Sequence, residues 1–457
     1  MTTDASRRAF LKRASALSVA GVATPWALNL AAMSAAAAAT ATDYKALVCV
    51  FLYGGNDYAN TLIPYDNTNY TAYQAMRPPL AYALADLAAT ALRPTVALPT
   101  GRQYALAPEL MPLLQHFNAG RLGVMLNVGT LVQPTTKAQY TASSVPLPPK
   151  LFSHNDQQSV WQSSAPEGAT SGWGGRMGDL FASGNSNATF TCVNVSGNAV
   201  FLSGHTAVQY QVTSSGPVAL SGVQSNLFGS AACSAALKSL VTASRTDVFE
   251  GEYNKVMSRS LDAGSQLTSA LAAAPALTTV FPSGNALGDQ LKLVARMISN
   301  ASAIGAKRQV FFVSIGGFDT HSSLNAVHPG LLKTVADAMS AFYSATVELG
   351  VSSQVTAFTA SDFGRTATGS DGSDHGWGSM HFMLGGAVNG GRFYGTAPAV
   401  ANNGPDDVGQ GRLLPSTSVD QYAATLGKWF DISDADLLTV LPNLVNWTSG
   451  QRNLAFI

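Results

Sequence analysis

The chain has 457 residues, of which 11% are charged and 46% are hydrophobic, and its formal net charge at pH 7 is zero. Soluble domains usually carry about 25% charged residues, so uncharged polar side chains must cover much of this surface. A balanced charge supplies no field that would attract nucleic acid, and nucleic-acid binding is therefore not expected. Three scattered cysteines, Cys49, Cys192 and Cys233, are too few for a disulfide framework or a cysteine-rich metal site.

Residues 1–41 have the pattern of an export signal: a basic start, a mildly apolar stretch and an end in small residues. The apolar part is short and is broken by Pro25 and Asn29, so no stable membrane span is expected after processing. We expect removal of residues 1–41, the twin-arginine export machinery as a partner, and a periplasmic or secreted mature protein. The resemblance to the twin-arginine motif is carried by Ser6, Arg7, Arg8, Phe10, Leu11 and Lys12.

Short apolar runs predict buried parallel strands. The first, ALVCVFLYGGND (residues 46–57), is apolar on both faces and stops at two glycines and an acid. The pattern recurs in QVFFVSIGGFDTH (309–321) and, without the glycine pair, in QVTAFTASDFGR (354–365). Residues 120–130 and 188–198 are further strand candidates.

Helical spacing of apolar residues, three and four positions apart, predicts helices over residues 246–271, 285–304 and 331–349. Two short closing helices are expected at 419–430 and 434–444, the second capped by Ser433. Residues 196–230, rich in Ser, Gly and Asn, predict an irregular or β insertion. Strands that alternate with helices indicate an α/β fold with a mostly parallel central sheet flanked by helices, and we expect 42–457 to form a single domain.

The ends of three predicted strands carry acidic and histidine side chains. Ligands bind at the carboxyl ends of the strands in open parallel sheets, so the segments GGND, GGFDTH and SDFGR should meet at one edge. The glycine-rich stretch SDHGWGSMH adds an aspartate and two histidines. The candidate metal ligands are Asp57, Asp319, His321, Asp362, Asp374, His375 and His381.

These residue types suit a divalent metal. Carboxylate and imidazole together favour zinc, manganese or iron, and carboxylates also bind calcium and magnesium. The number of ligands is adequate for two ions or for one ion with outer partners. Each residue also has a structural interpretation, because Asp57 could close a turn and Asp319 or Thr320 could cap a helix.

The segment LFSHNDQQSVWQS (151–163) offers candidate catalytic groups. Ser153 at a helix N-terminus beside a metal could act as a nucleophile, with His154 next to it, because the ion lowers the hydroxyl pKa and backbone amides cradle an oxyanion. Alternatively, Ser153 is only the helix cap and His154 a hydrogen-bonded core residue. Arg176 in GWGGRMGD and Arg365 in DFGRT could bind a tetrahedral oxyanion or form structural ion pairs.

The chain resembles an uncharacterised family of twin-arginine-exported bacterial proteins, a domain of unknown function related to the alkaline phosphatase and sulfatase superfamily. The likeness covers nearly the whole mature chain and is carried by FLYGGNDYANTLIPY, FSHNDQQSVWQ, GWGGRMGD, GGFDTH, SDFGRT, DHGWGSMHFMLGGAVNGG and YAATLGKWF. It implies a one- or two-metal site at the strand ends and a Ser, Thr or Cys nucleophile that attacks phosphorus or sulfur. In this comparison Asp57 is similar to the first-strand metal aspartate, Asp319 and His321 to the ligands of one metal, Asp362 to the acid of the SDHG motif, and His375 to the late histidine.

The chain also departs from the superfamily pattern. Phe363 stands where the SDHG motif has a histidine, and Asp319 and His321 lie closer together than the matching pair in alkaline phosphatases. Ser153, Thr61 and water remain alternative nucleophiles, and the absence of a CxPSR-like motif argues against a formylglycine sulfatase.

Together these features predict an exported metal-dependent hydrolase, with zinc as the favoured ion and a phosphate or sulfate ester, small or polymeric, as substrate. An exported binding or assembly protein with a degenerate site on the same fold is the alternative. An oxidoreductase loaded with iron before export is also compatible with these ligands.

Overall fold

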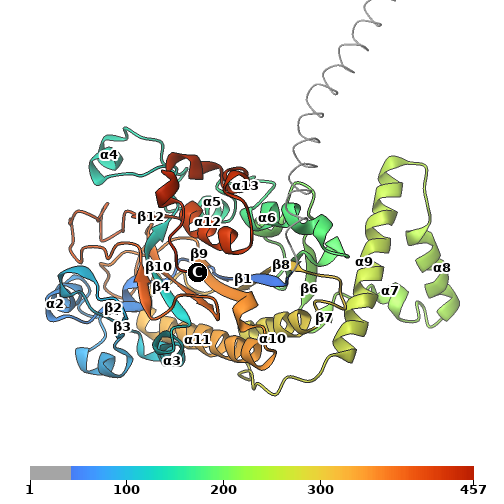
Figure 1. The fold of residues 1–457 in the computed structure, drawn as a ribbon, viewed down its shortest axis with the longest axis horizontal. Coiled ribbons are helices and arrows are strands. Elements are labelled where there is room, and N and C mark those ends of the chain that lie inside the picture. Colours follow the sequence, from blue (N-terminus) through green and yellow to red (C-terminus); the bar gives the residue numbers. More distant parts are fainter. Residues whose placement is uncertain (1–42) are drawn as a thin grey trace, which may run out of the picture.

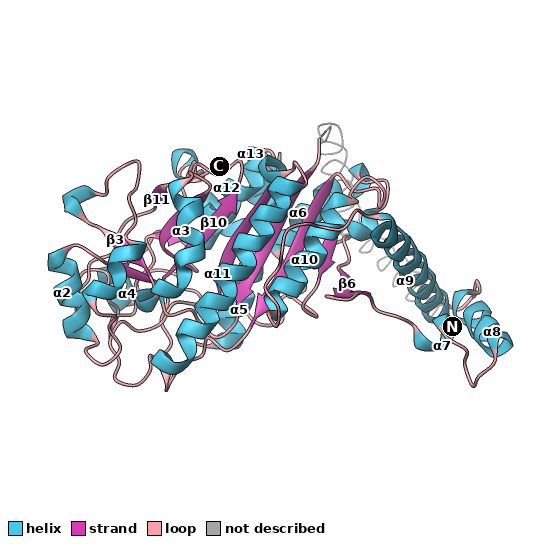
Figure 2. Ribbon diagram, turned by 90° about the horizontal axis from the view of Figure 1, so that it is seen from below, coloured by secondary structure: helices cyan, strands magenta, loops and turns pink. Residues whose placement is uncertain are grey.

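A computed structural model describes residues 43–457 and shows a ten-stranded mixed sheet with helices on both faces (Figure 1, Figure 2). The predicted signal segment, residues 1–41, lies outside the described part. The strand order is β11-β4-β10-β9-β1-β8-β5-β6-β7, and β12 pairs with β4. Neighbouring strands are parallel except at β10, which is antiparallel to β9 and β4, and at β7, which is antiparallel to β6. The mostly parallel α/β architecture is therefore confirmed.

The centre of the sheet is made by three parallel strands whose ends are level. In β1 (Lys45–Leu52), Leu52 lies opposite Ile315 of β8 (Arg308–Ile315) and opposite Ser361 of β9 (Val355–Ser361). The chain segments that follow these strands therefore leave the sheet at the same edge. The other strands are β4 (Leu122–Gly129), β5 (Cys192–Asn194), β6 (Tyr210–Thr213), β7 (Gly216–Pro217), β10 (Ser379–Gly385), β11 (Arg392–Tyr394) and β12 (Thr417–Ser418), with β2 (Leu62–Pro64) and β3 (Tyr104–Leu106) in a separate pair.

Two apolar cores lie on the two faces of the sheet. Alternate residues of β1 serve each core, with Val48 and Val50 in one and Cys49 and Phe51 in the other, which explains why this strand is apolar at every position. The first core contains residues of α3 (Met111–Asn118), α10 (Ala286–Ser299) and α11 (Leu324–Glu348); the second contains residues of α5 (His154–Ser163), α6 (Trp173–Phe181), α12 (Val419–Trp429) and α13 (Asp434–Val440).

Helix α2 (Asn67–Met76) and the second half of α9 (Val248–Ala273) also contribute residues to the first core. The remaining helices are α4 (Lys137–Ala142), α7 (Ser221–Gln224) and α8 (Ala231–Thr242). Figure 1 shows α7, α8 and much of α9 projecting from one end of the molecule. Within residues 43–457, no helix is both long and apolar enough to cross a membrane.

Most predicted elements are present, with two differences in the bounds or type of an element. Helix α11 begins at Leu324 and includes Pro329, whereas the sequence predicted a start after the proline; buried Leu324 and His328 anchor the additional turns. Residues 379–385 form a buried strand, β10, within a stretch that was predicted to be a glycine-rich loop. Residues 196–230 contain β6, β7 and α7 joined by irregular chain. The predicted cap is confirmed, since the Ser433 side chain accepts a hydrogen bond from the Asp436 amide.

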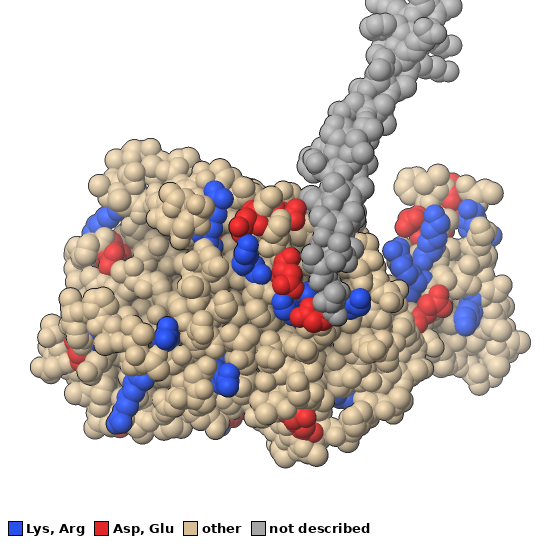
Figure 3. All heavy atoms as spheres, in the orientation of Figure 1, with Lys and Arg blue, Asp and Glu red and all other residues tan. Residues whose placement is uncertain are grey.

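The surface reflects the low charge content. Figure 3 shows large areas of the body without Lys, Arg, Asp or Glu.

Gly54 allows the ends of β1 and β8 to approach each other. Its φ angle is +114°, and a Cβ atom there would lie 2.3 Å from the Asp319 amide nitrogen. A side chain would therefore be strained by its backbone conformation and would also push away the backbone that carries Asp319.

We expect Gly54→Ala to lower the free energy of unfolding by about 3 kcal/mol, because backbone strain and overlap with backbone atoms add together. Gly330→Ala, within α11 and with no atom within 4 Å of the new Cβ, is the matched control and should be neutral or slightly stabilising. Urea unfolding followed by circular dichroism measures both. Equal stability of Gly54→Ala and the wild type would contradict the close approach of the two strand ends.

Candidate metal centre

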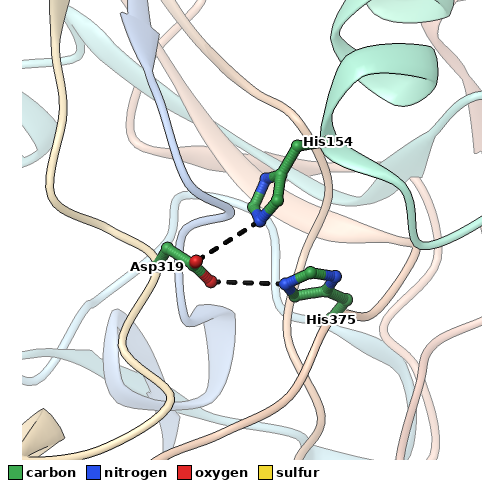
Figure 4. Close-up of side chains that lie close together, drawn as sticks. All are labelled: His154, Asp319 and His375. Carbon is green, nitrogen blue, oxygen red and sulfur yellow. Dashed lines mark ion pairs between the residues drawn. The ribbon is translucent and has the colours of Figure 1, made fainter.

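The carboxyl edge of the sheet gathers three histidines and an aspartate from separate segments. Asp319 and His321 follow β8, His154 begins α5, and His375 comes from the loop between β9 and β10. Figure 4 shows His154 and His375 pointing toward Asp319. Three chain segments far apart in sequence thus supply one cluster.

The Nε2 atoms of the three histidines surround the Asp319 carboxylate. His321 Nε2 lies 3.0 Å and His375 Nε2 3.3 Å from Asp319 Oδ1, and His154 Nε2 lies 3.5 Å from Asp319 Oδ2. The Nε2 atoms of His321 and His375 are 2.9 Å apart. The side chains of Asp319 and His321 remain 45% and 47% exposed, so solvent and a ligand can reach the cluster.

Two of the imidazoles are oriented by hydrogen bonds at their other nitrogen. His375 Nδ1 lies 2.6 Å from the Phe152 carbonyl oxygen, which can only accept, so Nδ1 carries the proton and the Nε2 lone pair faces the cluster. His154 Nδ1 lies 2.7 Å from Asp362 Oδ2, and its Nε2 atom is buried without a hydrogen-bond partner. An unpartnered buried nitrogen aimed at a carboxylate is the arrangement expected of a metal ligand.

Several separations among these donors are close to those around a tetrahedral ion. Zinc binds imidazole nitrogen and carboxylate oxygen at about 2.0–2.2 Å, which places neighbouring donor atoms of a tetrahedron about 3.4 Å apart. Four of the separations among these donors, 2.9 to 3.5 Å, lie near that value, and His154, Asp319 and His375 offer ligand atoms within 4.8 Å of one another. These residue types and distances are compatible with a divalent cation, and His154, Asp319, His321 and His375 are its candidate ligands.

The cluster offers fewer free donor atoms for a second ion. His321, Asp374 and His375 form another potential group, but it shares His375, whose one free nitrogen can serve only one ion. Phe363 packs its ring 4.8 Å from the rings of both His154 and His375, so an apolar side chain stands where the related motif has a histidine. The geometry favours one ion over two.

Arg365 holds Asp319 in place from the buried side of the cluster. Its guanidinium is fully buried, and Nη1 donates to Asp319 Oδ1 at 2.9 Å and to the Gly54 carbonyl at 2.8 Å. It also donates to the Ser373 carbonyl. All of its contacts are within the protein, so the expectation that Arg365 binds a substrate oxyanion is replaced by a positioning role for Asp319.

Local electrostatics favour the metal-binding protonation state at Asp319 and His375 and oppose it at His154. Burial by itself raises the pKa of Asp319, but the hydrogen bond and charge of Arg365 lower it, and the net pKa lies below its ordinary value. Burial lowers the pKa of His375, which favours its neutral ring. The hydrogen bond to Asp362 raises the pKa of His154, so a proton competes with a cation for this nitrogen.

Asp362 and Asp374 lie outside the ring of direct donors. Asp362 Oδ2 accepts hydrogen bonds from His154, from Gln158 Nε2 at 2.8 Å and from the Gly54 amide, so it orients His154. Asp374 pairs with Arg412 at 2.7 Å and stays 3.8 Å from His321 Nδ1. Both were predicted to be ligands, and the structure places them as outer partners.

Sequence reasoning missed Gln158 and Arg412. Gln158 lies four residues after His154 on α5, a spacing that puts both on one helix face and could have indicated it. Arg412 donates through Nε to the His375 carbonyl at 2.6 Å, and its guanidinium lies 5.0 Å from the Phe152 ring. No sequence pattern marked this arginine.

Asp57 does not join the cluster, which corrects the expected ligand role. It is fully buried, and its two oxygens accept bonds of 2.8 Å each from Arg77, with a third bond of 2.6 Å from Ser373 Oγ. It also caps a short 3-10 helix by accepting from the Asn60 amide. The turn-closing interpretation is the one that the structure supports.

Arg176 is likewise structural. Its guanidinium donates to the carbonyl oxygens of Val440, Ser171 and Ser163 and ties α6 to α5 and to the end of α13. With its donors used by backbone groups, it offers no clamp for an anionic substrate, contrary to expectation.

His381 and Thr61 are also engaged elsewhere. His381 lies within β10, 1% exposed, with Nδ1 3.1 Å from Thr359 Oγ1 and its ring against Trp161; burial lowers its pKa to about 3. Its expected ligand role failed because residues 379–385 form a strand. Thr61 Oγ1 donates to the Asp57 carbonyl inside a buried turn, which leaves it unsuited as a nucleophile.

Ser153 immediately precedes His154 at the start of α5. Its Oγ atom donates to Asp156 Oδ2 at 2.9 Å and accepts no hydrogen bond from a backbone amide of the helix. Asp156 is buried, and Lys150 lies 3.5 Å from it. The hydroxyl of Ser153 thus has a carboxylate partner that could receive its proton.

Comparison with known protein families assigns this chain to one of them. The model of the family described as "Protein of unknown function (DUF1501)" matches residues 44–441. The chain belongs to this family. Membership confirms the expected relation to a family of unknown function. None of the curated proteins matches the chain.

Some solved structures are distantly similar to this chain. Ps i-CgsB in complex with k-i-k-neocarrahexaose has 9% identity and a TM-score of 0.34, over 90% of this chain and 77% of that chain. PsFucS1 sulfatase from Pseudoalteromonas sp. has 8% identity and a TM-score of 0.30, over 89% and 71%. Likeness at this level carries no argument about the activity or substrate of this chain.

We expect Asp57→Asn to lower the free energy of unfolding at pH 7 by about 3–5 kcal/mol, because it leaves the Arg77 charge buried without its counter-charge. Burial alone raises the Asp57 pKa, but Arg77 lowers it more, so the folded-state pKa lies well below the unfolded value of about 3.9. The ion pair therefore contributes stability above about pH 4 that is lost as the pH falls further.

Urea unfolding at pH 7, 4 and 3 measures this effect, with exposed Asp86→Asn as the control. The difference between Asp57→Asn and the wild type should shrink below about pH 4. A difference that stays constant with pH would contradict an ionised Asp57 paired with Arg77.

Proposed function

We propose that this chain is an exported metal-dependent hydrolase of phosphate or sulfate esters, with one divalent cation, zinc in preference to manganese, calcium, magnesium or iron, held by His154, Asp319, His321 and His375. The observation that carries the proposal is the convergence of three histidine Nε2 atoms on the Asp319 carboxylate at 3.0 to 3.5 Å, with the His154 nitrogen unpartnered. We infer the reaction class from the motifs that resemble the alkaline phosphatase and sulfatase superfamily. The basic, twin-arginine-like N-terminus supports export to the periplasm or beyond.

The chain's own residues have distinct tasks in this proposal. Arg365 and Asp362 hold Asp319 and His154 in place, and the Phe152 carbonyl fixes the His375 ring. Arg412 pairs with Asp374 and donates to the His375 carbonyl, so it holds the loop that carries His375. A cation at this centre would supply the positive charge that polarises a phosphoryl or sulfuryl oxygen.

Ser153 is the proposed nucleophile. Its Oγ atom forms a bond to phosphorus or sulfur as the bond to the leaving alcohol oxygen breaks, and the hydroxyl proton passes to Asp156, with which it already shares a hydrogen bond. Water then hydrolyses the ester formed on Ser153 and releases phosphate or sulfate. Direct attack by water is the competing route, and Ser153→Ala separates the two.

Metal content is the first prediction. Protein purified without chelator should contain about one divalent ion per chain by elemental analysis, and an Asp319→Ala, His321→Ala double variant should contain little. Asp362→Asn, which removes the partner of His154, should weaken metal affinity by about 10–100-fold. His205→Gln, at an exposed histidine outside the cluster, is the control.

A folded wild-type protein without metal, after supply of zinc, manganese, calcium, magnesium and iron, would sink the hydrolase proposal. The exported binding or assembly protein would then be the better account.

Ester hydrolysis is the second prediction. The metal-loaded protein should hydrolyse 4-nitrophenyl phosphate or 4-nitrophenyl sulfate, and chelator should abolish the reaction. Ser153→Ala should reduce kcat by about 1,000-fold or more while metal content stays unchanged, because a nucleophile is lost but no ligand is. Retained activity in Ser153→Ala would assign the attack to water, and a metal-loaded wild type inert toward both ester classes would contradict the proposed reaction.

A further inference from the structure

Residues 221–260, which comprise α7, α8 and the first half of α9, form an arm that projects from the body (Figure 1, Figure 2). The buried residues of α9 gather in its second half, from Leu261 onward, where the helix meets the body. In the first half only Asn254 is buried, and its side chain donates to the carbonyl oxygens of Leu240 and Ala243 on the α8 side. The opposite side of this half-helix has no cover within the described chain.

That uncovered side carries an apolar stripe. Phe249, Tyr253 and Val256 are 87%, 57% and 48% exposed, and the next position of the same spacing is the exposed, polar Ser260. The spacing of the three apolar residues, four and then three positions, is that of the seam of a coiled coil. Large apolar side chains at seam positions are normally covered by another helix.

The charges beside the stripe specify how a covering helix would run. Glu252 and Arg259 are seven residues apart on the same flank, and Arg259 Nη2 lies 3.8 Å from Glu252 Oε1 along the helix. When two identical helices pack antiparallel, the same flank of each meets, so Glu252 of one copy faces Arg259 of the other, twice by symmetry. In a parallel pair this flank meets the opposite one, where Met257 stands and offers no charge to Glu252.

Figure 3 shows that both signs of charge gather on this arm while much of the visible body carries none. A self-complementary arrangement of opposite charges next to an exposed apolar seam favours a second copy of the same chain over an unrelated partner.

We propose that the first half of α9 is an antiparallel interface between two copies of this chain. The seam of Phe249, Tyr253 and Val256 packs against its own copy, and two Glu252–Arg259 pairs close one flank. With α8 behind each α9, the dimer contact is a four-helix arrangement set apart from the metal centre. The seam covers little more than one heptad, so the association is weak and depends on concentration. The proposal is independent of the hydrolase proposal.

Sedimentation velocity of the mature chain, residues 42–457, over about 1–100 µM tests this interface. The wild type should shift from monomer toward dimer as concentration rises. Arg259→Glu or Glu252→Arg alone should weaken the dimer by about tenfold or more, because like charges then face each other. The double variant Glu252→Arg, Arg259→Glu should recover wild-type association.

Lys333→Glu, an equal charge change on the exposed surface of α11, is the control and should associate as the wild type does. Phe249→Ser should leave a monomer. Circular dichroism and thermal unfolding confirm that each variant is folded, and the charge variants lie at exposed positions that tolerate exchange.

A wild type that stays monomeric throughout the concentration range would overturn the proposal. So would a dimer that neither single charge reversal weakens, or one that the double reversal does not restore. The proposal would also be contradicted if the chain stays monomeric and its arm binds a different protein tightly.

Discussion

The buried guanidinium of Arg365 joins the three strand ends on which the candidate metal centre stands. It follows β9, donates to the Gly54 carbonyl after β1, and donates to Asp319 after β8. Its bonds to the Ser373 carbonyl also fix the loop that carries His375. A buried charge must keep its partners, because losing one costs about 3–5 kcal/mol. The level register of β1, β8 and β9 makes this joint possible, and the joint then holds the position of Asp319.

Behind that joint lies a second buried pair. Arg77 pairs with Asp57, and Asp57 accepts a bond from Ser373 Oγ, so the same loop is held from two sides. The loop that carries His375 is therefore held by hydrogen bonds on its buried side. The side chains of Asp319 and His321 remain accessible to solvent. Rigid support beneath an accessible donor set is what a site needs if it is to bind a metal ion and a ligand together.

The sequence was enough to predict the central sheet and the convergence of its ends, because runs apolar on both faces occur where both faces are covered, as in β1. It also predicted three of the four proposed donors, Asp319, His321 and His375, as metal ligands, whereas His154 was predicted as a catalytic group beside Ser153 or as a core residue. It did not separate ligands from supports, because Asp57 and Asp362 look alike in sequence and differ only in what lies beside them, Arg77 in one case and His154 in the other. His381 was misplaced because glycines on both sides of β10 suggested a loop, whereas pairing with β4 and β9 makes this stretch a strand.

The central claim is that His154, Asp319, His321 and His375 bind one metal ion. X-ray absorption at the zinc edge of the zinc-loaded protein tests it most directly, since it counts and identifies the donor atoms around the ion. The account predicts three imidazole nitrogens and one carboxylate oxygen at about 2.0–2.2 Å. A spectrum without imidazole scattering, or one with the six oxygen neighbours of a hydrated ion, would contradict it.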